Sequence, residues 1–242
     1  MASHQCCRGA ARKRIAMKKT GVWAAAAVLA LAWGSAQADV LADIQKKGEI
    51  VVGVLGTDEP NSFIDPKTRE LVGYDVDLAK AVATKLGVKP VFKQLTVAAR
   101  IPELQQGHVD LLAASLTHTK EREAQLEFSI TTFITGQTVL VKKSSGINDV
   151  PDLAGKRVVT VKGGTQEPNT KKAVPTATVI TFDTAPQAFQ ALQQGKAAAF
   201  VNDDKSVVRA LVQLGEQGKD YKILPSNLSI EPLALGIKKG EL

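Results

Sequence analysis

The feature of this sequence that most restricts its fold is a regular alternation of β-branched runs with helix patterns that end at glycine. The run EIVVGVLG, residues 49–56, indicates a buried strand, because it is rich in valine and bounded by a charge and a glycine. Residues 74–86 instead repeat apolar side chains at helical spacing and are followed by Gly87. Such alternation predicts an α/β fold in which mainly parallel sheets are flanked by helices.

The tetrapeptide Leu-Gln-Gln-Gly occurs twice and marks two copies of one pattern. The first copy ends a predicted helix at Gly107, and the second ends another at Gly195. An apolar run follows each glycine, VDLLAA and AAAFV respectively, and stops at polar residues. Ligands of parallel α/β sheets collect beyond the carboxyl ends of the strands, so two such ends could face each other across a cleft. Convergence on a common helix ending is the alternative interpretation.

The two copies predict two lobes. We expect residues 39–132 with 233–242 to form the first lobe. Residues 133–232 are predicted to form the second, with hinge strands at its ends. The run FSITTFITGQTVLVKK, residues 128–143, lacks helical periodicity and predicts an extended crossover between the lobes.

The net charge of +7 comes almost wholly from the start of the chain. Six of the 31 basic residues precede residue 39, whereas all 24 acidic residues lie at or after it, which leaves the rest of the chain at +1. No basic stripe with interleaved aromatic residues remains. We therefore expect no nucleic-acid partner.

Residues 1–38 have the pattern of a leader with a signal peptide. A basic segment begins at Met17, where we expect the true start of the chain, and twelve apolar residues follow at 22–33. The small residues before position 39 predict cleavage between Ala38 and Asp39. A membrane span needs about 20 apolar residues, so we favour secretion to the periplasm over an anchor.

The residues that bind metals and carry nucleophilic chemistry are scarce. Cys6 and Cys7 both lie in the predicted leader, so the mature chain has no cysteine for a disulfide or a metal site. His108 and His118 lack metal-ligand spacing, and we expect them at the surface. No GxSxG or HExxH signature is present. We expect neither a cofactor nor a metal.

Polar residues follow the first apolar run. Ser115, Thr117 and Arg122 come after VDLLAA, and Thr119 is a candidate helix N-cap. An arginine in a first helical turn opposes the helix dipole, which hints at a functional role. Its planar fork suits a carboxylate. Ion pairing with the flanking glutamates is the alternative.

The second lobe offers complementary groups. Gly163, Gly164 and Thr165 follow a predicted strand and open a helix, a pattern typical of an anion-binding turn, although an ordinary glycine turn is equally compatible. Asp203 and Asp204 end the run AAAFV, and we expect one to cap the next helix and the other to accept bonds from an ammonium group. An anion site beside a carboxylate is the complement of an amino-acid zwitterion.

The sequence also resembles the periplasmic solute-binding proteins of ABC importers, in particular the polar amino-acid family. The resemblance covers nearly all of the mature chain and rests on LVGYDVDLAKAVA, RIPELQQGHVDLLAASLTHTKER, DLAGKRVVTVKGGT and AAFVNDD, in that order. It implies a two-lobed fold of the type II periplasmic-binding-protein kind, which closes on a free amino acid and docks on a membrane permease. It also implies a monomer without a cofactor.

By matching motif positions, the resemblance implies roles for individual residues. Arg122 would hold the α-carboxylate with help from Thr117 and Thr165. Asp203 and Ser115 would hold the α-ammonium group.

Specificity is implied less directly. Arg100 falls where glutamate- and aspartate-binding members place an arginine facing the ligand, which favours an acidic amino acid. A structural ion pair is its alternative role. Asn61 stands where a phenylalanine is frequent, and Asp58 would suit a basic ligand side chain. Gly164 completes the predicted ligand-binding set.

Two rival functions share this fold. Glu167 would serve as a general acid in a periplasmic dehydratase of the cyclohexadienyl dehydratase kind. An extracellular sensor domain is the other rival, and it requires a membrane segment. Relatives continue past Leu242 into C-terminal helices, so we expect either a truncated chain or a broken reading frame.

Overall fold

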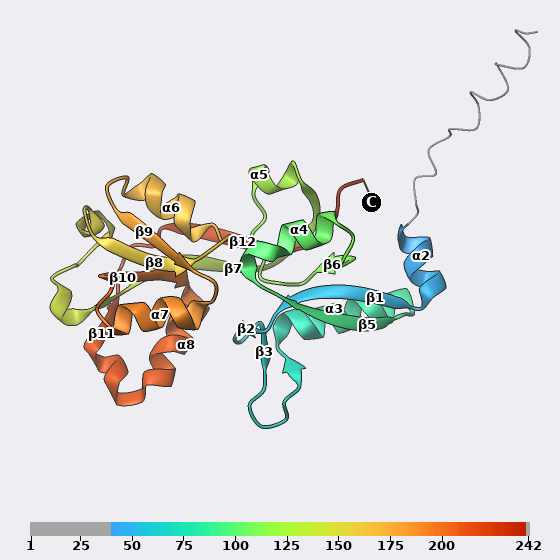
Figure 1. Cartoon of the computed structure of the whole chain (residues 1–242), viewed down its shortest axis with the longest axis horizontal. Helices are drawn as coiled ribbons and strands as arrows, with labels where there is room; N and C mark the ends of the chain where they lie inside the picture. The colour runs from blue at the N-terminus through green and yellow to red at the C-terminus, as the bar shows by residue number, and fades with distance from the viewer. Residues whose placement is uncertain (1–39, 241–242) are drawn as a thin grey trace, which may run out of the picture. The chain divides into compact units, whose positions relative to one another are not determined.

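Two long strands connect the halves of this fold. β7 (Leu126–Lys142) and β12 (Ser229–Lys238) pair antiparallel and run between two groups of elements in the computed structural model (Figure 1). The structure describes residues 40–240, which belong to one compact unit. The predicted leader, residues 1–38, lies outside the described residues. The predicted extended crossover is confirmed, because it forms most of β7.

The main sheet is mixed and contains two parallel groups. Its order is β5 (Lys89–Leu95), β1 (Glu49–Leu55), β6 (Leu111–Leu112), β12, β7, β10 (Ala199–Asp203), β8 (Arg157–Val161) and β9 (Thr178–Phe182), with β11 (Tyr221–Ile223) also pairing with β7. β1 is parallel to β5 and β6, and β8 is parallel to β9 and β10. The antiparallel strands β12 and β7 join these groups. The predicted α/β class is therefore confirmed.

A small antiparallel sheet lies outside the main one. It consists of β2 (Thr57–Asp58), β3 (Ser62–Ile64) and β4 (Leu71–Val72). The predicted lobe boundaries at 132/133 and 232/233 fall within β7 and β12. The exact division into lobes stays a prediction.

Helices flank both parallel groups. The α-helices are α2 (Val40–Lys47), α3 (Tyr74–Leu86), α4 (Arg100–Gln105), α5 (Lys120–Glu123), α6 (Gln166–Ala173), α7 (Ala185–Gln193) and α8 (Asp204–Leu214). Short 3₁₀ turns span Val97–Ala99, Lys143–Ser145, Val150–Leu153 and Gly215–Asp220. α3 packs against β1 and β5, and α7 packs against β8, β9 and β10. No helix within residues 40–240 is long and apolar enough to cross a membrane.

Both LQQG segments end helices as predicted. α4 and α7 each stop two residues before the glycine, at Gln105 and Gln193, and both Gly107 and Gly195 have a φ of 72°. A Cβ at either position would meet nothing within 4 Å, so backbone conformation alone favours glycine there. The strand after the first copy is shorter than VDLLAA predicts, because β6 contains only Leu111 and Leu112.

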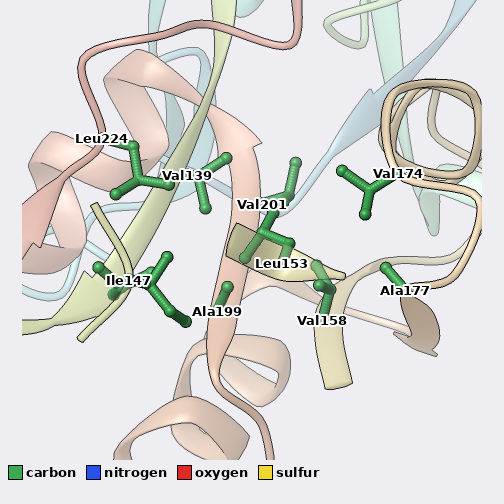
Figure 2. Close-up of a cluster of buried hydrophobic side chains, with 10 residues drawn as sticks. Val139, Ile147, Leu153, Val158, Val174, Ala177, Ala199, Val201 and Leu224 are labelled. Carbon is green, nitrogen blue, oxygen red and sulfur yellow. The ribbon is translucent and has the colours of Figure 1, made fainter. Parts of the chain in front are cut away.

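Each lobe has its own hydrophobic core on both faces of its sheet. Figure 2 shows one cluster of the second lobe, in which Leu153 and Val158 pack with Val139 and Val201 and are fully buried. A second cluster under α7 and α8 includes Phe200. Corresponding clusters lie under α3 and α4 in the first lobe. These cores fix the strand ends that carry the polar residues described next.

Candidate ligand-binding site

A cavity of about 280 Å³ brings all seven predicted ligand-binding residues together. Its lining includes Arg100, Ser115, Thr117 and Arg122 from the first predicted lobe and Gly164, Thr165 and Asp203 from the second. These residues lie in or beside helix starts and strand ends, which is where parallel α/β sheets place their ligand sites. This volume lies just below the usual range of about 300 to 1,000 Å³ for ligand pockets.

Arg122 supplies a buried cation to this cavity. It lies in α5, and its amide donates to the Thr119 hydroxyl at 3.3 Å, which confirms the predicted N-cap. Nη1 donates to the Thr117 carbonyl at 2.8 Å, and Nη2 donates to the Gly163 carbonyl at 3.3 Å. Burial lowers the pKa of Arg122, while the nearby Glu231 carboxylate opposes this shift. A guanidinium has five N–H donors, so capacity remains for a ligand carboxylate.

Asp203 supplies a buried carboxylate at the end of β10. Its Oδ1 accepts a hydrogen bond from Gln166 Nε2 at 3.1 Å. Burial raises the pKa of Asp203 to about 7, although the Lys205 ammonium opposes the shift. A ligand ammonium group would stabilise the ionised form. Asp203 is therefore suited to receive a cationic group.

One of Asp203 and Asp204 was predicted to cap the following helix. Asp203 does occupy the N-cap position of α8, but the prediction of a capping hydrogen bond from its side chain is wrong. Asp204 lies inside the first turn, where its carboxylate accepts bonds from the Thr135 hydroxyl at 2.5 Å and the Lys205 amide at 2.6 Å. The reason is that Gln166 holds Asp203 instead.

Ser115 and Asp58 form a hydrogen-bonded corner of the cavity. Ser115 has a left-handed backbone with a φ of 49°, and its hydroxyl donates to Asp58 Oδ2 at 2.6 Å. Asn61 Nδ2 donates to the same oxygen at 2.9 Å. The Ser115 amide donates to Asp75 Oδ2 at 2.8 Å. The Ser115 hydroxyl also lies 3.2 Å from Asp75 Oδ2, so both of its carboxylate neighbours belong to the first predicted lobe.

Asp58 lines the cavity, although it was not among the predicted ligand-binding residues. Among residues 40–240, no lysine, arginine or histidine forms an ion pair with it. The signal that could have found it is its place just after the carboxyl end of β1, which matches the place of Ser115 after β6. Asn61 supports Asp58 instead of providing an aromatic wall.

Arg100 is only 3% exposed, and backbone carbonyls hold its guanidinium. Nε donates to Val97 O at 2.9 Å, and Nη1 donates to Ala114 O at 2.8 Å and Ser115 O at 3.0 Å. Nη2 lies 3.5 Å from Gly163 O. Burial lowers the pKa of Arg100 to about 9. These bonds occupy most of the N–H donors of Arg100. They favour a role in positioning the backbone over the two predicted roles, which were contact with the ligand and a structural ion pair.

The start of α6 lines the cavity with Gly164, Thr165 and Gln166. The Thr165 hydroxyl accepts a bond from Gln137 Nε2 at 2.6 Å and donates to Glu231 Oε2 at 2.8 Å. Its proton is therefore committed to Glu231. The first-turn amides of a helix have no intrahelical partners and favour anions, so they are the donors that this segment offers a carboxylate.

Glu167 and His118 do not line the cavity. The Glu167 carboxylate forms an ion pair with Lys171 at 2.6 Å. His118 bonds to Glu123 at 2.6 Å and stacks on Phe128, so its predicted surface position is confirmed only in part. The position of Glu167 does not support the dehydratase hypothesis.

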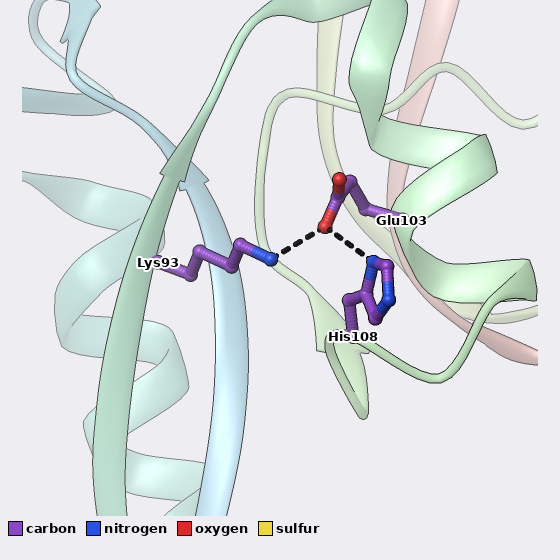
Figure 3. Close-up of polar contacts among 3 residues, drawn as sticks. All are labelled: Lys93, Glu103 and His108. Carbon is purple, nitrogen blue, oxygen red and sulfur yellow. Dashed lines mark hydrogen bonds and ion pairs between the residues drawn. The ribbon is translucent and has the colours of Figure 1, made fainter.

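His108 belongs to a surface cluster, shown in Figure 3. Glu103 accepts bonds from Lys93 Nζ at 2.6 Å and contacts His108 Nδ1 at 3.2 Å. The histidine side chain is 52% exposed, which confirms its predicted surface position. No group of three or more histidine, aspartate or glutamate side chains within residues 40–240 is arranged to hold a metal ion.

Comparison with known proteins identifies the family. Residues 50–225 match the profile of the bacterial extracellular solute-binding proteins, family 3. This protein belongs to that family. The match spans both predicted lobes, and it confirms the resemblance that the sequence motifs indicated.

Relatives within family 3 have names that refer to different amino acids. The glutamine-binding protein GlnH of an ABC transporter in Bacillus subtilis (strain 168) is 34% identical over 207 residues, which cover 84% of this chain and 74% of GlnH. The L-glutamate/L-aspartate-binding protein of Pseudomonas aeruginosa is 30% identical over 213 residues, which cover 83% and 70% of the two chains.

A solved structure gives the same fold. An ancestral arginine-binding protein has been solved with arginine and with glutamine, and it is 38% identical to this chain. The TM-scores are 0.74 and 0.73, and the matches cover 80% of this chain and 85% of the other. The two-lobed fold of this family 3 protein is thereby confirmed.

Proposed function

We propose that this protein binds a free α-amino acid in the periplasm, as a monomer, and delivers it to the membrane permease of an ABC importer. The observation that carries the proposal is the pair formed by Arg122 and Asp203, a buried cation and a buried carboxylate that line one cavity. Because they line the same cavity from the two predicted lobes, we expect one zwitterion to contact both. Membership of family 3 supports the transport role.

The α-carboxylate is held by the fork of Arg122 and by the amides at the start of α6. The α-ammonium group is held by Asp203. Both contacts form completely only when the lobes are together, so the ligand stabilises the closed state. Thr117 contributes through its carbonyl, which orients the Arg122 guanidinium.

The cavity favours a ligand whose side chain ends in hydrogen-bond donors, and glutamine is the first candidate. Asp58 lines the cavity without an ion-pair partner, and a ligand carboxylate placed there would be repelled. An amide or guanidinium group would donate hydrogen bonds to it. GlnH of Bacillus subtilis and the ancestral protein bound to glutamine support this choice.

An acidic amino acid, glutamate or aspartate, is the second candidate. Arg100 lines the cavity and favours it by charge. The relative in Pseudomonas aeruginosa also supports it. The carbonyl contacts of Arg100 argue against it, because few guanidinium donors remain.

A thermal-shift screen with each of the twenty amino acids tests the proposal. A ligand that binds only the folded state stabilises it, by about 2.7 kcal/mol when its concentration is 100 times its Kd, and this stabilisation raises the melting temperature. We expect the largest shift with glutamine or arginine and a smaller shift with glutamate. No shift with any amino acid would refute the function, and the largest shift with glutamate would favour the second candidate. Incubation with prephenate or arogenate should show no turnover.

A further inference from the structure

Gly163 lies directly against a backbone segment of the other predicted lobe. A Cβ at position 163 would lie 2.5 Å from Ala98 Cα, 2.9 Å from Ala98 N and 3.0 Å from Ala98 Cβ. Two of these atoms belong to the backbone, so a change of rotamer could not relieve the overlap. Gly163 also has a φ of 83°, which favours glycine independently.

The carbonyl of Gly163 faces two buried guanidinium groups of the first lobe. Arg122 Nη2 donates to it at 3.3 Å, and Arg100 Nη2 lies 3.5 Å away. Arg100 also holds the 3₁₀ turn Val97–Ala99 through its bond to Val97 O at 2.9 Å. That turn contains Ala98. Arg100 therefore fixes the segment that meets Gly163.

We propose that Gly163, Ala98 and Arg100 form a closure joint, the contact that sets how far the two lobes can approach each other. Carbon atoms pack at about 3.5 to 4.0 Å, so a side chain at 163 would push Ala98 back by roughly an ångström. A ligand that contacts both Arg122 and Asp203 would then make at least one of these contacts less well, which weakens binding. The proposal rests on the proposed function, because it assumes that closure traps an amino acid.

The test compares Gly163→Ala with Gly195→Ala by titration calorimetry and stopped-flow release of glutamine. Gly195 is a matched control, since its φ is 72° but a Cβ there would meet nothing within 4 Å. Overpacking of this kind predicts roughly 5- to 150-fold weaker binding in Gly163→Ala, with most of the change in the release rate. Gly195→Ala should lose stability to backbone strain alone and keep wild-type affinity.

A second variant keeps the test decisive if Gly163→Ala does not fold. Ala98→Leu changes the other side of the joint at an exposed position, and it should also speed ligand release. Equal affinity in Gly163→Ala and Gly195→Ala, or wild-type release in Ala98→Leu, would overturn the joint. If the wild-type protein binds no amino acid, the proposed function fails first and the joint falls with it.

Discussion

Amino-acid affinity should fall about tenfold for each pH unit below 7, because Asp203 must be ionised to hold the ligand ammonium group. Burial raises the pKa of this carboxyl to about 7 in the ligand-free protein. A bound ammonium group lowers it again, so binding at acidic pH must release a proton. On the order of 1% of the carboxyl is ionised at pH 5. We therefore expect affinity at pH 5 to be roughly 100-fold weaker than at pH 8.

The assay is calorimetric titration between pH 5 and 8, in pairs of buffers with different ionisation enthalpies. The number of protons released on binding should rise from near zero at pH 8 toward one at pH 5. His108→Gln and His118→Gln are controls, because neither histidine lines the cavity, and they should keep the wild-type profile. An affinity that stays constant over this range, without proton release, would refute the reasoning.

The pH dependence of stability in the ligand-free protein is opposite to that of affinity, because Asp203 favours the folded state at low pH. Its folded pKa of about 7 lies above the usual 3.8, so the folded state holds the proton more tightly. The contribution to stability is full below pH 3.8 and is lost as the pH rises through 7. At pH 8, Asp203→Asn should raise the free energy of unfolding by up to about 4 kcal/mol while it abolishes binding. Urea unfolding at pH 8 measures this, and a destabilised variant would contradict it.

Three further substitutions test separate parts of the account. Asp58→Asn should weaken arginine binding by about tenfold and leave glutamate binding equal or tighter, and competition titrations would show the ratio. Thr165→Val should lower stability by about 1 to 3 kcal/mol because it leaves the buried Glu231 carboxylate short of a donor, as urea unfolding would show. Leu153→Ala, at a fully buried position, should cost about 2 to 5 kcal/mol of stability. Titration of Leu153→Ala with glutamine should give the wild-type affinity.

The grouping of the site residues could be predicted because sheet topology determines it. Strand ends of parallel groups lie at one edge of a sheet, so Ser115 and Asp203 could be placed in one cavity from their positions after apolar runs. The helix ends at Gly107 and Gly195 could also be predicted, since they depend on local backbone conformation.

The hydrogen-bond partners within the site could not be predicted from local patterns. Ser115 bonds to Asp58, 57 residues earlier, and Arg100 bonds to the carbonyls of Ala114 and Ser115. These contacts depend on how close separate segments come in three dimensions. The same limit explains the error at Asp203, whose partner Gln166 lies 37 residues away and removes the expected cap.

The measurement that tests the central claim most directly is titration of glutamine into wild-type protein and Arg122→Ala, with Arg157→Ala as the exposed control. We expect one ligand per chain, and a loss of roughly 2 to 5 kcal/mol of binding free energy in Arg122→Ala alone. Arg157→Ala should bind as the wild type does. Equal affinity in wild-type protein and Arg122→Ala would contradict the account.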